Sequence, residues 1–431
     1  MTPKPIKIDD LRPEEYRTLM QRSQIDISSV YERVRDIIRD VKTNGEDVFL
    51  NYYREHLKPD LCPQDLEVGP GERKAAYAAL DSKVIEALRL AAQHITTFHQ
   101  AQLDKQMWAT EIAHGIVAGR MTTPIDHVGA YIPGGKASYP SSVLMTLLPA
   151  RVAGVKELIM CTPPGESMAV DPATIVAADI AGPAKIYKVG GPWAIASMAY
   201  GTKSIDKVDK IVGPGNKYVT AAKAMVFGEV ALDSPAGPSE GMVLADNTGN
   251  PDFILIDLLS QAEHDPDSAT VLVTTSEKLA IDVAAKITKA LPELPRRDIV
   301  NSSVKRYSHI LIARDMDQAI CFVNDYAPEH LELMTEDPFA VLPKIKHAGS
   351  IFMGPFSPIA AGDYASGTNH VLPTGQKARI FSGLSVDDFL KKPTFQHVTK
   401  EGLSLLKEAV VTLAQAEGLN LHAQSILERF K

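Results

Sequence analysis

From about Asp126 onward, short runs rich in β-branched residues alternate with helical segments, and Gly and Pro mark the joins between them. This alternation is typical of βαβ units that build a parallel sheet. The predicted strands form two sets: 127–132, 157–161, 184–189 and 209–212 in the first, and 241–245, 269–274, 308–313 and 350–353 in the second. Helices are predicted in the second set at 251–264, 276–291 and 315–325. The pattern therefore predicts an α/β protein with two such units.

The two ends of the chain have a helical periodicity instead. Val30, Val34, Ile38 and Val41 recur at helical spacing, and apolar residues between about 72 and 103 keep the same period. The last fifty residues return to this pattern, in short segments separated by glycines. We therefore expect helical extensions at both ends of the α/β units.

Composition narrows the class of protein. A chain of 431 residues is long enough for two to four packed units, and 45% hydrophobic with 23% charged residues argues against wholesale disorder. With 45 Lys and Arg against 53 Asp and Glu, the net charge is −8, and no basic block is present to follow a phosphate backbone. We expect no nucleic acid partner.

The sequence also lacks the usual signs of export. No apolar run reaches the roughly 18 to 20 residues that span a bilayer, and the first residues contain no apolar core of a signal peptide. Cys62, Cys161 and Cys321 are far apart and have no CxxC spacing, which disfavours a disulfide framework. We therefore expect no membrane association and a cytoplasmic location.

Four loops dense in Gly and Pro, at 131–135, 189–193, 212–216 and 235–240, are candidates for ligand binding. Three of them lie where a predicted strand meets a helix, where backbone N–H groups can hold an anion such as a pyrophosphate. None matches the G-x-G-x-x-G fingerprint of dinucleotide sites, and for any single loop an ordinary tight turn is an equal alternative.

Several side chains could bind a metal ion, but spacing alone does not assemble them into one site. Gln261 and His264 are three residues apart and share a helix face, although a histidine at a helix end can simply interact with the helix dipole. Asp363 lies in a Gly-flanked polar loop and could equally cap a turn. His422 could be an ordinary surface histidine.

Glu329 and His330 are adjacent, directly after a proline and before a predicted strand. A carboxyl group beside an imidazole is a plausible acid–base pair. A solvated turn followed by an edge strand is the structural alternative.

Long motifs give the chain a specific resemblance. They are GAYIPGGKASYPSSVLMTLLPARVAGV, DKIVGPGNKYVTAAK, DSPAGPSE, DLLSQAEHD, NDYAPEHLEL, HAGSIFMGPFSPIAAGDYASGTNHVLPT and SGLSVDDFLKK. In these motifs and their order, the chain resembles the histidinol dehydrogenase family over nearly its whole length.

The resemblance implies a pair of incomplete Rossmann-like parallel-sheet domains, arranged as in aldehyde dehydrogenases, with helical N-terminal and C-terminal extensions. It also implies a homodimer with shared active sites. The expected boundaries are an N-terminal extension at 1–24, a first domain at 25–130 together with 241–380, a second domain at 131–240, and a tail domain at 381–431 that reaches the partner subunit. The first domain would carry the zinc and acid–base residues, and the second would contact NAD.

The activity implied is the last step of histidine biosynthesis. L-Histidinol would be oxidised through L-histidinaldehyde to L-histidine, with two NAD molecules reduced. His330 would be the general base that removes the hydroxyl proton, and Glu329 would activate the water that adds to the aldehyde. One zinc ion per subunit would orient the substrate. The residues that match the family's zinc ligands are Gln261, His264, Asp363 and, from the other subunit, His422.

The resemblance also implies the binding contacts. Tyr131 and Asn216 match positions that contact NAD. The substrate contacts would be Ser239, Gln261, His264, His330, Asp363, Glu417 and His422. One position departs from the family, which usually has Gln where this chain has Trp193. We hypothesise that Trp193 still lines the dinucleotide site and stacks on an aromatic ring of NAD.

Two alternatives compete with this interpretation. The first is a related zinc- and NAD-dependent dehydrogenase of another small alcohol, such as a sulfonated propanediol. The presence of Glu417, His422 and the segment 138–142 favours histidinol. The second is a catalytically silent zinc- or nucleotide-binding protein, which the intact Glu329–His330 pair disfavours.

Overall fold

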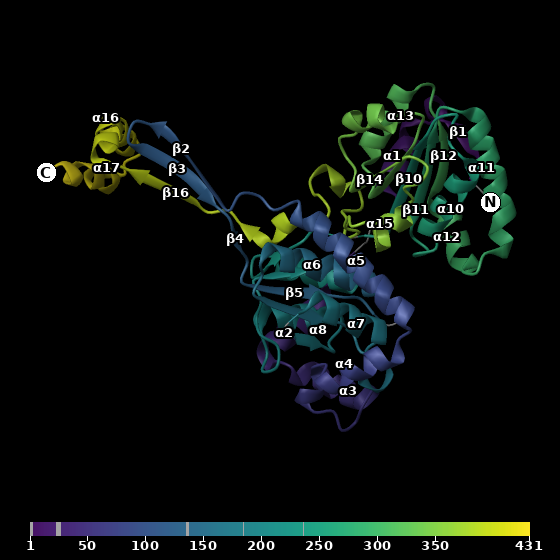
Figure 1. The fold of residues 1–431 in the computed structure, drawn as a ribbon, viewed down its shortest axis with the longest axis horizontal. Helices are drawn as coiled ribbons and strands as arrows, with labels where there is room; N and C mark the ends of the chain where they lie inside the picture. Colours follow the sequence, from purple (N-terminus) through teal and green to yellow (C-terminus); the bar gives the residue numbers. More distant parts are fainter. Residues whose placement is uncertain (1–2, 23–26, 135–137, 184, 236) are drawn as a thin grey trace. The chain divides into compact units, whose positions relative to one another are not determined.

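The computed structural model describes residues 3–22, 27–134, 138–183, 185–235 and 237–431 (Figure 1). The chain divides into two compact units. The first comprises Met1–Gln102 and Asp126–Asp388, and the second comprises Leu103–Ile125 and Phe389–Lys431.

The first unit contains a sheet of six parallel strands in the order β1-β12-β11-β10-β13-β14. Their bounds are β1 Pro5–Lys7, β10 Glu240–Ala245, β11 Ala269–Thr274, β12 Ser308–Ile312, β13 His330–Met334 and β14 Ser350–Met353. One face packs on a core that includes Met242 and Leu244 and is covered by α1 Pro13–Gln21 and α13 Met316–Tyr326. The other face, with Val243 and Ala245, packs against α10 Pro251–Ala262, α11 Glu277–Ala290 and α12 Arg297–Tyr307. Helices therefore cover both faces, as parallel sheets require.

The same unit contains a second sheet, of five parallel strands in the order β7-β6-β5-β8-β9. The strands are β5 His127–Tyr131, β6 Glu157–Cys161, β7 Lys185–Tyr187, β8 Lys210–Val212 and β9 Ala231–Leu232. The helices between them are α6 Pro140–Ala153, α7 Pro172–Ala181, α8 Gly191–Tyr200 and α9 Lys217–Val226. The predicted α/β class, with two incomplete Rossmann-like sheets, is confirmed.

The helices near the N-terminus pack on the side of this second, five-stranded sheet. They are α2 Tyr31–Asn44, α3 Asp47–His56, α4 Pro70–Ala79 and α5 Ser82–Gln100. Val34, Phe49 and Leu66 share one buried core with Tyr187 and Ile195. This grouping differs from the expected boundaries, which joined residues 25–130 to 241–380. Helical periodicity identifies an apolar face, but it does not identify the sheet that this face will cover.

All eight strands of the two predicted sets are present in the described part of the chain, with ends that differ by at most two residues. For the strand expected at 184–189, Ala184 lies outside the described residues and β7 spans Lys185–Tyr187. The helices expected at 251–264, 276–291 and 315–325 correspond to α10, α11 and α13.

The second unit contains strands that the sequence analysis did not identify. β2 Met107–Ala113 and β3 Ile116–Met121 form an antiparallel sheet with β16 Thr394–Val398. β4 Thr123–Pro124 pairs with β15 Leu390–Lys391, and the predicted tail helices are α16 Lys400–Ala416 and α17 Asn420–Leu427. Every residue of β2 is exposed, so no buried face produces the alternation that identifies a strand.

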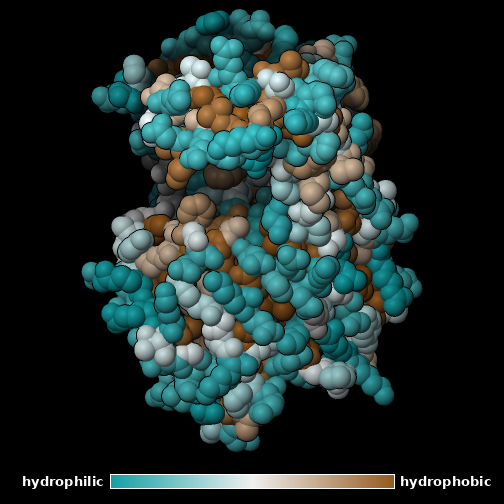
Figure 2. All heavy atoms as spheres, turned by 90° about the vertical axis from the view of Figure 1, so that its left-hand side faces the viewer, coloured by the Kyte–Doolittle hydropathy of each residue, from teal (hydrophilic) through white to brown (hydrophobic). Residues whose placement is uncertain are grey.

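The surface carries mainly hydrophilic residues on the face drawn in Figure 2, with apolar residues in separate small groups. The second unit leaves several large apolar side chains exposed: Met107, Ile112, Leu405, Leu413 and Leu421. In the part of the chain that the structure describes, no helix combines the length and apolarity needed to cross a bilayer.

Candidate active site

Glu329 and His330 stand at the amino end of β13 and are buried, with exposed fractions of 6% and 4%. β13 lies between β10 and β14, and His330 is paired in register with Gly241. The alternative of a solvated turn before an edge strand is therefore wrong. A buried carboxyl group and a buried imidazole require specific partners, because an unpaired buried charge is strongly destabilising.

The backbone of Glu240 supplies partners for both side chains. Its N–H donates to Oε2 of Glu329 at 2.8 Å, and its carbonyl oxygen lies 3.0 Å from Nδ1 of His330. Because a carbonyl oxygen can only accept, Nδ1 carries the proton of this hydrogen bond. Nε2 of His330 has no hydrogen-bond partner among the described residues and lies 3.4 Å from Oδ1 of Asp363. When the ring is neutral, its basic nitrogen is therefore Nε2, on the Asp363 side.

Charges around the pair shift the pKa values of the three groups. Burial raises the pKa of Glu329, and the neighbouring His330 opposes this rise. Burial alone would lower the pKa of His330, but the Glu329 and Asp363 carboxylates hold it well above its usual value. Burial alone would raise the pKa of Asp363, but the nearby His330 ring lowers it. Such perturbed groups are typical of reaction centres.

Three of the predicted metal ligands lie in the first unit. Gln261 is buried in the last turn of α10, and a Cβ added at Gly241 would lie 2.6 Å from its Cγ, so this glycine makes room for the amide side chain. Asp363 lies in α15 Ile359–Tyr364, a helix that contacts α10. His264 follows α10 and is exposed, yet the protein packed around it lowers its pKa, and the charge of Asp363 opposes this effect.

The donor set fits a metal ion of the zinc type. Imidazole nitrogen, carboxylate oxygen and amide oxygen are ligands that zinc accepts, and a catalytic zinc site needs about three protein ligands and an open position. Nevertheless, no three His, Cys, Asp or Glu residues within the described ranges already form a metal-binding group. The side chain of Asp363 faces the His330 ring, as the 3.4 Å contact shows.

The other predicted residues are in different surroundings. Ser239 is half-buried just before β10. Glu417 and His422 lie in the second unit, at the end of α16 and within α17, and both are exposed. Their roles in binding substrate and metal stay predictions.

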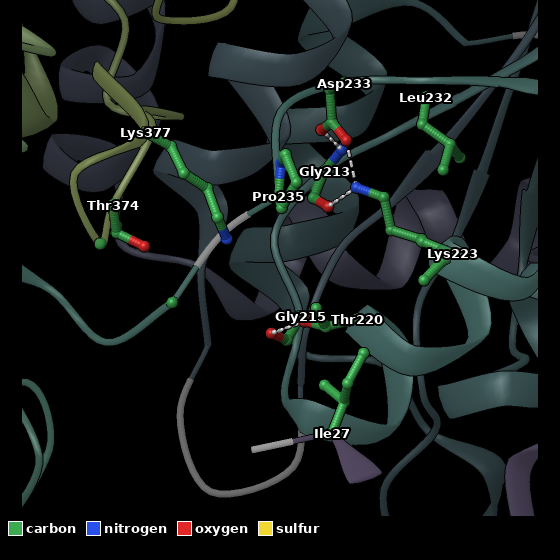
Figure 3. A pocket seen from close by; sticks show the side chains of 13 residues that line it. Ile27, Gly213, Gly215, Thr220, Lys223, Leu232, Asp233, Pro235, Thr374 and Lys377 are labelled. Atoms are coloured by element: carbon green, nitrogen blue, oxygen red, sulfur yellow. Dashed lines mark hydrogen bonds and ion pairs between the residues drawn. The ribbon is translucent and has the colours of Figure 1, made fainter. Parts of the chain in front are cut away.

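The loop at 212–216 borders a cavity of about 340 Å³ (Figure 3). Gly213, Gly215 and Thr220 line one side, and Thr374 and Lys377 line another. Figure 3 shows a buried ion pair at the cavity wall, in which the Lys223 ammonium binds Asp233 and also donates to the carbonyl of Gly213 at 3.0 Å.

Asn216 is the last residue of this loop and caps α9. Its side-chain oxygen accepts from the N–H groups of Tyr218 and Val219, and the residue is exposed, so its amide nitrogen is available to a ligand. This position fits a cofactor contact at the carboxyl end of β8.

The loop at 189–193 is hydrogen-bonded to two tyrosines. The N–H groups of Gly190 and Gly191 donate to the hydroxyls of Tyr53 and Tyr131, each at 3.2 Å. Trp193 packs against α3, with its ring centroid 4.9 Å from that of Tyr52. The indole N–H of Trp193 is buried and has no partner among the described residues.

Comparison with known proteins places this arrangement in a family. Residues 20–430 match the family model described as histidinol dehydrogenase. The chain belongs to the histidinol dehydrogenase family. It is 47% identical over 426 residues to histidinol dehydrogenase from Methanothermobacter thermautotrophicus, with 99% of each chain covered. It is 46% identical to the enzyme of that name from Methanocaldococcus jannaschii, covering 99% of this chain and 98% of the relative.

A solved structure of the histidinol dehydrogenase family has the same fold over almost the whole chain. The crystal structure of histidinol dehydrogenase from Elizabethkingia anophelis matches with a TM-score of 0.94 and 40% identity, and covers 99% of this chain and 98% of that one.

Sequence reasoning missed several residues of this histidinol dehydrogenase family site. Glu240 was recognised only as the last residue of a loop, and Arg22 was not recognised, although the two side chains form a buried ion pair across 218 positions. His370 was also overlooked: its Nε2 lies 3.0 Å from Oγ of Ser142, and its Nδ1 lies 2.8 Å from the carbonyl of Asp363. No local pattern identifies partners that are so distant in sequence.

Proposed function

We propose that this chain oxidises L-histidinol to L-histidine through L-histidinaldehyde and reduces two NAD molecules, the last step of histidine biosynthesis. Membership of the histidinol dehydrogenase family supports the substrate. The observation that carries the mechanism is the buried Glu329–His330 pair, in which the free Nε2 of His330 lies on the side of Asp363.

In the first oxidation, Nε2 of His330 accepts the hydroxyl proton of the alcohol while the hydride leaves the carbinol carbon for NAD. The Nδ1–H bond to the carbonyl of Glu240 fixes the tautomer that leaves Nε2 basic. General base catalysis of this kind contributes about 10²- to 10⁴-fold to the rate.

In the second oxidation, Glu329 takes a proton from water as the water adds to the aldehyde carbon. The resulting hydrate carries a hydrogen and a hydroxyl group on the same carbon, as an alcohol does. Once His330 has released its first proton, the hydrate loses a second hydride to NAD while His330 removes the proton of a hydroxyl group. The sum consumes one alcohol, one water and two NAD⁺ and yields one carboxylate, two NADH and three protons. The hydrogen bond from the Glu240 N–H orients Glu329 for this role.

Gln261, His264 and Asp363 would hold one zinc ion per subunit, with His422 from the partner as the fourth ligand. When bound, zinc supplies Lewis acidity and a fixed anchor for the imidazole and amine of the substrate. Tyr131 and Asn216 would contact NAD, and Ser239 and Glu417 would contact the substrate. Trp193 would line the dinucleotide site near Tyr131.

The proposal includes a homodimer with shared sites and a cytoplasmic location. The exposed apolar side chains of the second unit, such as Leu413 and Leu421, support an interface there.

Shared sites are tested by mixing His330→Asn chains with His422→Asn chains, each of which is inactive alone. If His422 completes the partner's site, mixed dimers contain one intact site, and equal mixing restores about a quarter of wild-type activity. Absence of any recovery after subunit exchange would contradict shared sites.

The reaction itself is tested by the NADH formed when limiting L-histidinol is run to completion by the zinc-loaded protein, with a chelated sample alongside. The proposal predicts two NADH per substrate and none after chelation. A yield of one would contradict the role of Glu329 in the second oxidation. If NADH forms from a sulfonated propanediol and not from L-histidinol, the substrate assignment is wrong.

A further inference from the structure

We propose that Arg22 is a positioning residue for the acid–base pair and acts through Glu240. The inference rests on the proposed roles of Glu329 and His330. It concerns an arginine that precedes the two strands of the site by more than two hundred residues and touches neither catalytic side chain in any described contact.

Arg22 forms a buried two-point ion pair with Glu240. Its Nε donates to Oε1 and its Nη2 to Oε2, both at 2.6 Å. The two side chains have exposed fractions of 3% and 1%. Only a guanidinium presents two parallel donors in this geometry, so lysine cannot reproduce the contact.

The same guanidinium also holds the segment that leads into the catalytic pair. Nη1 donates to the carbonyl of Tyr326 at 2.8 Å, Nη2 approaches the carbonyl of Ala327 at 3.3 Å, and the cation lies 3.8 Å from the centre of the Tyr326 ring. These carbonyls come directly before Pro328, Glu329 and His330. Ala327 has a φ of +50°, a conformation that an alanine keeps only where its surroundings impose it.

Glu240 connects these contacts to the catalytic side chains. Its backbone N–H and C=O bind Glu329 and His330 respectively, while its carboxylate receives Arg22 and the N–H of Gly375 at 2.8 Å. Without Arg22, the carboxylate would stay buried with a single N–H donor, a state that favours displacement of the residue. A shift of Glu240 would move both donor and acceptor that orient the acid–base pair.

The expected consequence is a loss of rate and not of binding. A misplacement of about 1 Å at a reacting group can lower the rate about 100-fold. Because Arg22 has no described contact with the cofactor loop at 212–216, the KM for NAD should stay within about threefold of wild type.

The experiment compares full-length, zinc-loaded Arg22→Met, Arg22→Lys and His330→Asn with wild type. Arg73→Met is the matched control, because Arg73 also forms an ion pair, with Asp179 at 2.9 Å, between α4 and α7. For each protein, kcat, both KM values and the melting temperature are measured. We expect kcat to fall about 10- to 100-fold in Arg22→Met and about 3- to 10-fold in Arg22→Lys, with little change in either KM.

Each outcome is decisive. If His330→Asn is inactive while kcat of Arg22→Met stays within twofold of wild type, the inference about Arg22 is overturned and the proposed function stands. It is also overturned if Arg22→Met loses activity only in proportion to unfolded protein, as Arg73→Met would. If His330→Asn remains active, the proposed acid–base roles fail, and the inference fails with them. If Arg22→Met does not fold, Arg22→Lys carries the same test.

Discussion

The two parallel sheets of the first unit share one strand order, apart from the additional edge strand β1 in the first sheet. The residues to which we assign functions lie at opposite ends of their strands. In each, the strand order reverses between two central neighbours, β5 and β8 in one sheet and β10 and β13 in the other. The predicted NAD contacts lie at the carboxyl ends of β5 and β8: Tyr131 is the last residue of β5, and Asn216 follows β8. Glu240 and His330 instead begin β10 and β13.

The difference follows from what each task requires. Binding a dinucleotide uses backbone N–H groups and helix starts, which parallel sheets offer at the carboxyl ends of their strands. Acid–base chemistry needs buried side chains held by defined hydrogen bonds. The amino end of β10 provides these through the backbone of Glu240. In this account, the reversal of the strand order determines which pair of strands carries the functional residues of each sheet. The chemistry of each task determines whether these residues lie at the amino or the carboxyl ends of those strands.

The strongest test of this division is the replacement His330→Asn. We expect kcat to fall about 10³-fold because the base is lost, while the KM for NAD changes by less than about twofold. Steady-state kinetics with both substrates measures this. A tenfold rise in the KM for NAD with little change in kcat would mean that the two ends are not functionally separate.

A glycine-to-alanine substitution can disturb the amino end of β13 without changing a catalytic side chain. A Cβ at Gly349 would lie 2.5 Å from the carbonyl oxygen of Glu329, so Gly349→Ala must shift that residue. We expect kcat to fall about 10- to 100-fold.

Gly71→Ala is the control for this glycine, because nothing lies within 4 Å of the added Cβ on α4. It should leave kcat unchanged and should not destabilise the protein. Equal activity of the two variants would show that displacement of Glu329 is tolerated.

At the carboxyl end of the other sheet, Asn216→Ser should raise the KM for NAD about 3- to 10-fold and leave kcat within twofold. Serine keeps the oxygen that caps α9 but lacks the amide donor, so the cap and the cofactor contact are separated. Thermal unfolding measured beside the kinetics shows whether the cap is kept. A fall in kcat with unchanged KM would contradict a cofactor role.

A half-buried histidine in β12, away from the strands β10 and β13, should affect stability alone. Burial lowers the pKa of His309, in β12, to about 4. Below the unfolded value of about 6.5, the unfolded chain binds a proton that the folded chain does not, so stability declines from about pH 6.5 towards pH 4.

His309→Gln removes this decline, and we expect its stability relative to wild type to improve by about 2 kcal/mol between pH 7 and pH 4.5. Denaturant unfolding at the two pH values measures the change, and kcat at neutral pH should be unaltered. A parallel loss in both proteins would show that His309 does not titrate as inferred.

The sequence predicts buried features better than exposed ones. The strands at 241–245 and 269–274 are buried throughout and mostly apolar, as is typical of strands covered on both faces, and they were found close to their true bounds. β2 and β16 were missed because neither has a fully buried residue. The helical periodicity at 30–41 and at 72–103 was recognised, but the second stretch forms two helices, α4 and α5. The packing of these helices against the second sheet depends on contacts between distant segments.

In the site, the sequence predicts local patterns better than contacts between distant segments. Adjacent Glu329 and His330, and Gln261 with His264 one helical turn apart, are local patterns that sequence reasoning can recognise. The ion pair of Arg22 with Glu240 has no local pattern, because it forms only when a segment near the N-terminus packs beside β10.

The most direct measurement is the dissociation constant of NAD, by titration calorimetry, for zinc-loaded wild type, His330→Asn and Asn216→Ser. The account assigns acid–base chemistry to the amino ends of β10 and β13 and NAD binding to the carboxyl ends of β5 and β8. It predicts that His330→Asn binds NAD within about twofold of wild type, and that Asn216→Ser binds it at least about threefold more weakly. If His330→Asn loses NAD affinity as much as Asn216→Ser, or if Asn216→Ser binds NAD as wild type does, the division between amino and carboxyl ends is wrong.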